Sequence, residues 1–497
     1  MRRPLPALMV TLLALLGPAA GLFLTEASKA DHGWPSFRGP LGNGLAPDAD
    51  PPHEWSEGSN VRWKVELPGE GHSTPIVWGD RVYLTVAIKK EAPAAPPVEA
   101  PAGRADPHGS GAVAQARFAQ EDPQPGSPPE SPPGPPGGAP PGPPEPPGPE
   151  GPQRRGPRAP RPAPTVTHDF AVMALDRATG KTIWKTTVAE QVPHEAGHET
   201  ASQASASPLT DGERIYAFFG SRGLHCLDMK GAVLWSRDFG DMRTRNQFGE
   251  GASPALHGDT LLVNWDHEGE DFIAALDKRT GRERWRTARD EPTSWTTPYV
   301  VEDGGRTLAV VSATNRVRAY DVATGAEAWS VGGLGLNCIP TPVAAGGLLY
   351  VMSGYQNPAG LAIRYPGAEG DIGGERIAWK VDRGTSYVAS PLLYDGKLYF
   401  LDRLRAALSR VDLATGQAHY SEQRLEGLGN VYGSPAGAAG RVYIVDRAGN
   451  AVVVKHGDAF EVIGWGKLDD GFDASPVIAG DALFLRGHRH FYCIGRS

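Results

Sequence analysis

One motif in this sequence matches a familiar arrangement for metal chemistry. Residues His194-Glu-Ala-Gly-His198 fit the pattern His-Glu-x-x-His, which on a helix turns both imidazoles toward one metal and makes the Glu a general base. Pro193 precedes the motif and Gly197 interrupts it, so we predict a loop and no metalloprotease. A looser metal site that joins these histidines to His72 or His267 stays open as an alternative. The preferred interpretation assigns no metal.

Other residues suited to binding gather in two kinds of segment. One group stands shortly before Ser-Pro or Thr-Pro pairs, and the other follows apolar runs. The candidate ligand-binding residues are His72, His198, Glu250, Asn264, Trp265, Asp266, His267, Trp295, Tyr387, Tyr432 and Asp473. Similar positions are held by Cys338, by residues 353–356 and by Asp402 and Arg403.

The chemistry of these side chains depends on whether the fold brings them together. If it does, they predict a funnel with aromatic walls and several carboxylates, suited to a ligand or partner. For Glu250, Asp266 and Asp473 an alternative stays open, in which they cap turns or accept hydrogen bonds from backbone groups. No catalytic residue is assigned.

The elements that must position these residues repeat along the chain. A Ser-Pro or Thr-Pro pair opens a short apolar run at positions 74, 207, 253, 297, 341, 390, 434 and 475. From Pro208 onward the pairs recur at intervals of 41 to 49 residues, a period typical of β-propeller blades.

One repeat shows the predicted blade clearly. Four apolar runs, at 298–301, 307–312, 317–320 and 327–330, are separated by turns rich in Gly, Asn and Asp. This pattern predicts four short antiparallel strands. The turn before the fourth strand reads Asp-x-x-Thr-Gly, and an aromatic residue follows each such Gly by four positions, as in Trp285 and Trp329. We expect these tryptophans, with Trp379 and Trp465 in less regular repeats, to pack between neighbouring blades.

The last repeat lacks a fourth strand at the C-terminus. We expect residues 61–67, which precede the first Thr-Pro pair, to supply it by pairing beside residues 491–494. Such pairing would close the ring and remove exposed sheet edges. The sequence thus predicts an all-β fold, an eight-bladed β-propeller of four-stranded antiparallel blades.

These Ala-Leu-Asp-x-x-Thr-Gly-x-x-x-Trp units resemble the pyrroloquinoline-quinone (PQQ)-like repeat of the quinoprotein alcohol dehydrogenase superfamily, which includes BamB-type propellers. The resemblance covers residues 33–497 apart from one insertion. For the quinoprotein dehydrogenases it implies PQQ stacked between a Trp and a disulfide of adjacent cysteines, with a bound calcium ion. Here Cys226, Cys338 and Cys493 lie far apart, so no cofactor is expected, and PQQ with calcium is kept as an alternative.

The composition limits the classes of partner that the chain is expected to bind. The formal net charge is −8, and no basic stripe suggests nucleic-acid binding. Three scattered cysteines do not indicate a disulfide framework. We expect a monomer whose partner is an envelope protein or a small-molecule ligand on the funnel.

Two segments do not belong to the repeats: one precedes the first blade, and the other interrupts that blade between its second and third strands. Residues 1–30 read as a signal peptide, with Arg2 and Arg3 before an apolar stretch at 7–24, although an uncleaved anchor is an alternative. Residues 31–88 hold the closing strand and the start of blade one. Residues 89–165 form a Pro- and Gly-rich insertion expected to be disordered, and 166–497 complete the propeller.

The leading hypothesis is an exported, periplasmic or extracytoplasmic propeller that acts as a non-catalytic binding or scaffold module in the cell envelope. The alternative is a PQQ-dependent periplasmic oxidoreductase of the alcohol or sugar dehydrogenase type. A hydrolase or lyase that uses the histidines and carboxylates of the funnel is a third option.

Overall fold

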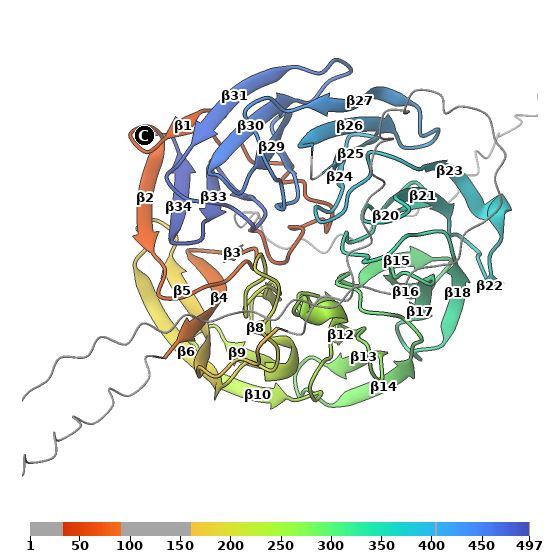
Figure 1. Cartoon of the computed structure of the whole chain (residues 1–497), viewed down its shortest axis with the longest axis horizontal. Helices are drawn as coiled ribbons and strands as arrows, with labels where there is room; N and C mark the ends of the chain where they lie inside the picture. Colours follow the sequence, from red (N-terminus) through yellow and green to blue (C-terminus); the bar gives the residue numbers. More distant parts are fainter. Residues whose placement is uncertain (1–32, 91–160, 403–404, 497) are drawn as a thin grey trace, which may run out of the picture. The chain divides into compact units, whose positions relative to one another are not determined.

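The computed structural model describes residues 33–90, 161–402 and 405–496. In this part of the chain, eight antiparallel sheets of at least four strands stand around a ring (Figure 1). The contacts divide the chain into one unit of residues 1–91 and 160–497 and a second of 92–159. The predicted signal peptide and nearly all of the predicted insertion lie outside the described residues.

Each sheet is one blade, numbered here from the first Thr-Pro pair. Blades 1 to 4 consist of β3 (Ile76–Trp78), β4 (Arg81–Lys89), β5 (His168–Asp176), β6 (Thr182–Gln191); β7 (Leu209–Thr210), β8 (Arg214–Phe218), β9 (Leu224–Asp228), β10 (Val233–Arg237); β11 (Ala255–His257), β12 (Thr260–Trp265), β13 (Phe272–Asp277), β14 (Glu283–Ala288); and β15 (Tyr299–Asp303), β16 (Arg306–Val311), β17 (Val317–Asp321), β18 (Glu327–Val331).

Blades 5 to 8 continue the ring. They consist of β19 (Val343–Ala345), β20 (Leu348–Ser353), β21 (Ala359–Arg364), β23 (Ile377–Val381); β24 (Leu392–Tyr394), β25 (Lys397–Asp402), β26 (Ala407–Asp412), β27 (Ala418–Arg424); β28 (Ala436–Ala438), β29 (Arg441–Val445), β30 (Asn450–Lys455), β31 (Val462–Lys467); and β32 (Val477–Ala479), β33 (Ala482–Arg486), β34 (His490–Gly495), β2 (Val61–Glu66). Two short strands, β1 (Trp55–Ser56) and β22 (Gly370–Asp371), add parallel edges to β31 and β18. Three 3-10 turns lie at Gly220–Arg222, Arg245–Gln247 and Gly374–Arg376.

Burial follows the position of a strand within its blade. The second strand β12 is buried at every residue, because both faces of the blade pack against neighbouring blades. The outermost strand of the same blade, β14, alternates half-buried and exposed residues, as expected of a strand with one solvated face. The apolar runs of the sequence therefore become the middle strands.

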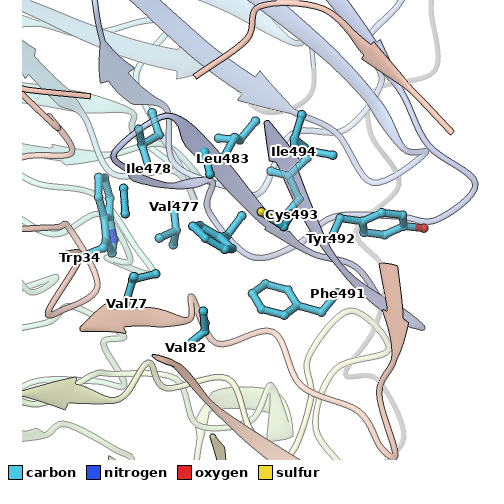
Figure 2. Packing of buried hydrophobic residues seen from close by; sticks show 14 of the residues in the cluster. Trp34, Val77, Val82, Val477, Ile478, Leu483, Phe491, Tyr492, Cys493 and Ile494 are labelled. Atoms are coloured by element: carbon cyan, nitrogen blue, oxygen red, sulfur yellow. The ribbon is translucent and has the colours of Figure 1, made fainter. Parts of the chain in front are cut away.

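The ring is closed by the N-terminal strand, as predicted. Strand β2 pairs antiparallel with β34, and Val65 lies opposite Phe491. The core of this closure contains Trp34, Val77, Phe491 and Ile494, contributed by both ends of the described chain (Figure 2). The eight-bladed architecture predicted from the repeats is confirmed.

The residues before the eight prolines form a second ring inside the first. In seven places the backbone N–H of one blade's Ser or Thr donates to the hydroxyl of the next blade's Ser or Thr, at 2.9 to 3.3 Å. The series includes Ser475 N–H to Thr74 Oγ1, which joins blade 8 to blade 1. The eighth bond, between Thr297 and Thr341, is missing, and the Thr341 hydroxyl is buried without a partner.

Tryptophans join the blades at the outer edge. Trp285 Nε1 donates to the Val322 carbonyl of the next blade at 2.8 Å, and its ring packs against Gly325. The turn at Gly325 has φ +77°, and an added Cβ would lie 2.6 Å from that indole. Trp63, Trp184, Trp235 and Trp379 make the same bond to their neighbours. The expectation fails at Trp465, which is 48% exposed, because the third and fourth strands of the next blade, β34 and β2, come from opposite ends of the described chain and no Asp-x-x-Thr-Gly turn joins them.

The first described residues cross the central channel. Trp34 exchanges two backbone hydrogen bonds with Val77 of blade 1, and the Pro35 carbonyl accepts one from Thr210 of blade 2. On the opposite side of the ring, Arg38 donates to the carbonyls of Pro391 and Pro435 at 3.0 and 3.1 Å. Residues 33–50 thus contact inner strands across the ring, and we call them the channel segment (Figure 1).

Candidate functional site

The candidate residues belong to one edge of the ring, which we call the funnel face. In every blade the loop that leads into the first strand and the loop that joins the second and third strands lie at this edge, because the strands alternate in direction. Residues His72, His198, Glu250, Trp295, Tyr387, Tyr432 and Asp473 lie in loops of the first kind. The structure sorts them into three separate groups around the face.

The first group surrounds Asp473, between blades 8 and 1. The buried carboxylate accepts a 2.6 Å hydrogen bond from Arg447 Nε at Oδ1. Its other oxygen, Oδ2, lies 2.8 Å from His488 Nε2 and 3.4 Å from His72 Nε2. Among the described residues this is the one set of three His, Cys, Asp or Glu whose ligand atoms all lie within 4.8 Å of one another.

Burial sets the charge of this group. It lowers the pKa of His72 to about 4, against the raising effect of Asp473, so the imidazole is neutral near pH 7. Burial alone would raise the pKa of Asp473, but His488, His72 and Arg447 together lower it. Asp473 is therefore ionised and hydrogen-bonded. Tyr432 joins the group from blade 7, since the Arg447 guanidinium lies 4.6 Å from the centre of its ring.

The second group lines a small pocket between blades 2 and 4. Glu250, Trp295 and Glu195 are among its lining residues, and its volume of about 30 Å³ is that of a water site. Glu250 Oε2 accepts a 2.6 Å hydrogen bond from Ser221 N–H, and Ser221 Oγ donates to its other oxygen. Burial raises the pKa of Glu250 to about 7, and nearby Glu195 adds to the effect.

The edge of this pocket is aromatic. His198 packs edge-on against Phe248, with ring centres 5.3 Å apart, and Trp295 lies 6.4 Å from the same ring. Trp295 Nε1 donates to the Gly249 carbonyl at 2.7 Å. Arg161 lies over Phe248 and donates to the carbonyls of Gly197 and Gln247. The C-terminal end of the predicted insertion therefore reaches this part of the funnel face.

The third group is a pair of tyrosines between blades 5 and 6. Tyr355 and Tyr387 are stacked, with ring centres 5.3 Å apart and planes 25° from parallel. Tyr355 is 50% exposed. Asn337 Nδ2 donates to the Tyr387 hydroxyl at 3.4 Å.

Four of the candidates are buried beneath the funnel face. Asn264, Trp265, Asp266 and His267 are all buried at the end of β12. Asp266 is bound by both Arg289 Nε at 2.6 Å and Arg289 Nη2 at 3.1 Å, and neither side chain is exposed. Asn264 donates to Ser294 Oγ, and His267 Nδ1 accepts from Arg243 N–H. These contacts join loops of blades 2 to 4.

The His-Glu-x-x-His segment is a loop, as predicted. Glu195 accepts hydrogen bonds from Thr244 N–H and Thr244 Oγ1, His194 lies 3.5 Å from Asp241, and His198 bonds Thr200. His72, His194, His198 and His267 therefore point to four different sets of partners. The looser metal site built from these histidines is not formed.

The family of the chain follows from comparison with known proteins. The family model described as outer membrane protein assembly factor BamB matches residues 165–263, 224–365 and 269–497, together two thirds of the chain. The chain belongs to this family. A search of curated proteins finds no match.

Solved structures similar to this BamB-family propeller include both assembly factors and enzymes. BamB from Moraxella catarrhalis is 14% identical, with a TM-score of 0.47 over 66% of this chain and 93% of that one. The quinohemoprotein alcohol dehydrogenase from Comamonas testosteroni is 10% identical, with a TM-score of 0.54 over 94% and 81%. A europium-containing methanol dehydrogenase is 11% identical, with a TM-score of 0.54 over 91% and 89%. The likenesses to the two dehydrogenases, both with TM-scores above 0.5, show the fold.

The residues of this BamB-family chain do not fit PQQ as the quinoprotein dehydrogenases hold it. Its three cysteines are buried, unpaired and in different blades, at Cys226, Cys338 and Cys493. Burial raises the pKa of Cys226 and Cys493 to about 12, so both are inert thiols. No adjacent pair can form the disulfide on which the quinone stacks.

Sequence reasoning overlooked several residues of the funnel face. His488 and Arg447 lie in loops that join second and third strands, the loop class already used for other candidates. In the sequence, Glu195 stands out only as the Glu of the His-Glu-x-x-His pattern, and nothing there indicates that it lines the pocket. Tyr355 belongs to residues 353–356, which were named above as a group, and its exposure in the structure distinguishes it as a binding candidate.

Proposed function

We propose that this chain is a non-catalytic binding module of the cell envelope, exported from the cytoplasm, whose funnel face binds a partner protein. The observation that carries the proposal is the stacked, half-exposed pair of Tyr355 and Tyr387. Exposed tyrosines supply a large contact area at low entropic cost and are enriched in protein interfaces. Tyr432 under Arg447 extends the same chemistry toward blade 8.

The family supports a role in the cell envelope. The matching family is described as an outer membrane protein assembly factor, which is an envelope role. The N-terminal residues, with Arg2 and Arg3 before an apolar stretch, favour export on sequence grounds. In the described part of the chain, no helix is long and apolar enough to span a membrane.

Site-specific photo-crosslinking tests the proposal in the organism that makes the protein. A photoreactive amino acid at Tyr355 should give one defined adduct with an envelope protein, and Tyr387→Ala should weaken that adduct several-fold. The matched control is the exposed Glu302, which lies near the end of β15, beside the turn to β16 on the opposite edge of the ring. Equal crosslinking at both positions, or at neither, would contradict a specific funnel-face partner.

The alternative oxidoreductase activity is tested by reconstitution. Purified protein with added PQQ and calcium should show no bound quinone absorbance and should not reduce an artificial electron acceptor in the presence of alcohols or sugars. Reduction of the dye that depends on PQQ would favour the enzyme over the binding module.

A further inference from the structure

We propose that His72, Asp473 and His488 bind one divalent transition-metal ion of the zinc class on the funnel face. The inference is independent of the partner-binding role, because it rests on the geometry of these three side chains alone. The sequence led to no metal assignment here. His72 and His488 belong to different ends of the chain and meet only through ring closure.

The spacing of the three ligand atoms suits a metal ion. Zinc binds imidazole nitrogen and carboxylate oxygen at about 2.0–2.2 Å, so two ligands of a tetrahedral site lie roughly 3.3 Å apart. His72 Nε2 lies 3.4 Å from Asp473 Oδ2, and His488 Nε2 lies 2.8 Å from the same oxygen. The shorter distance is that of the hydrogen bond between His488 and Asp473, and it must open by about half an ångström when an ion enters.

Neighbouring groups hold these ligands in place. Arg447 Nε donates to Asp473 Oδ1 at 2.6 Å and Arg447 Nη2 donates to Oδ2 at 3.5 Å, and the two imidazoles face the same Oδ2. Hydrogen bonds that fix a ligating carboxylate in this way are the usual support of metal sites. Gly471 makes room for His488, because a Cβ at this position would lie 2.8 Å from the imidazole Cε1.

The chemical types of the three ligands favour a transition-metal ion over calcium or magnesium. Two imidazoles and one carboxylate suit zinc and its transition-metal neighbours, whereas calcium and magnesium prefer oxygen ligands only. Three protein ligands leave a fourth position, and the 37% exposure of the His488 side chain places that position toward solvent. Arg447 and the buried Arg486 lie near, and their positive charge opposes that of the ion. We therefore expect an ion that a chelator removes readily.

Cobalt titration of the full-length protein, carrying no histidine tag and stripped with a chelator, tests the site. Co²⁺ should bind one equivalent per chain with the visible absorption of a four-coordinate site, and Zn²⁺ should displace it. Excess Zn²⁺ should raise the melting temperature of the wild type by mass action. The variant His488→Asn should weaken Co²⁺ binding at least about tenfold and lose the zinc-dependent rise.

A nearby histidine provides the matched control. His490 lies two residues from His488 and pairs with its own carboxylate, Asp470, at 3.2 Å, outside the proposed group. His490→Asn should leave the cobalt spectrum and the zinc effect unchanged. The proposal is overturned if the stripped wild type binds neither ion, or if both variants weaken binding equally. If His488→Asn melts lower than the wild type without metal, the wild-type spectrum and stoichiometry still decide.

Discussion

At the scale of single residues, the funnel face holds charged groups in states that their sequence positions do not reveal. Glu250 and Asp473 occupy equivalent loops of blades 3 and 8. Burial raises the pKa of Glu250, whereas at Asp473 the raising effect of burial is outweighed by His488, His72 and Arg447 together. Both carboxylates accept hydrogen bonds, Glu250 from Ser221 and Asp473 from Arg447. The turn-capping alternative raised for Glu250 thus has structural support, and whether either residue binds a ligand stays a prediction.

The raised pKa of Glu250 predicts a pH-dependent stability. Its value changes from 4.5 to about 7 on folding, so the native state binds the proton more tightly and loses stability as pH rises through that window. Glu250→Gln removes this loss, because the Gln amide oxygen can accept from Ser221 N–H and its amide nitrogen can donate to Ser221 Oγ. The variant should gain on the order of 1–3 kcal/mol relative to the wild type between about pH 5 and about pH 8.

Urea unfolding at the two pH values measures this difference. The exposed Glu302 serves as the control, since Glu302→Gln should leave the pH profile unchanged. A Glu250→Gln profile parallel to that of the wild type would show that the carboxyl group titrates normally in the native state.

At the scale of elements, most of the fold could be predicted from local patterns. The Ser/Thr-Pro pairs and Asp-x-x-Thr-Gly turns mark where strands begin and end, because Pro and Gly act through backbone geometry that the sequence itself encodes. The exposure of Trp465 was not predicted from its own repeat, because it depends on the neighbouring blade, in which no turn joins β34 to β2. Likewise, the meeting of His72 with His488 depends on tertiary contacts that no local pattern carries.

The inner ring of hydroxyls predicts unequal effects of one substitution at two neighbouring blades. Thr297 Oγ1 accepts a 3.2 Å hydrogen bond from Ser253 N–H, whereas Thr341 Oγ1 is buried without a partner. Thr297→Val leaves a buried N–H unsatisfied and should lower the free energy of unfolding by about 1–3 kcal/mol. Thr341→Val should be neutral or stabilising. Denaturant melts of both variants compare them directly, and equal losses would contradict the role given to the ring.

At the scale of the whole molecule, the N-terminal residues contribute to the propeller in two places. Strand β2 supplies the outer edge of blade 8, and the channel segment contacts inner strands on both sides of the ring. Trp34 of the channel segment and Trp63 of β2 are buried, as is Trp55 of β1. The first part of the described chain is therefore integral to the fold.

Truncation tests this dependence. A chain that starts at residue 33 keeps β2 and the channel segment, and we expect its melting temperature to match that of the full-length protein. A chain that starts at residue 68 loses both, exposes the edge of β34 and should aggregate or melt without a cooperative transition. Size-exclusion chromatography and calorimetry distinguish the two, and a cooperative, monomeric shorter chain would show that the other blades suffice.

The closing pair of strands also sets an order of events during synthesis. Arg62 donates a hydrogen bond to the carbonyl of Arg496, 434 residues further along the chain. The ribosome makes β2 before every strand of blades 1 to 7 and reaches its partner β34 only after them, so β2 stays unpaired while those blades are made. Contacts so distant in sequence form slowly, and an unpaired strand edge is prone to aggregate in the meantime. A nascent chain of this protein therefore depends on protection of β2 until β34 has been made.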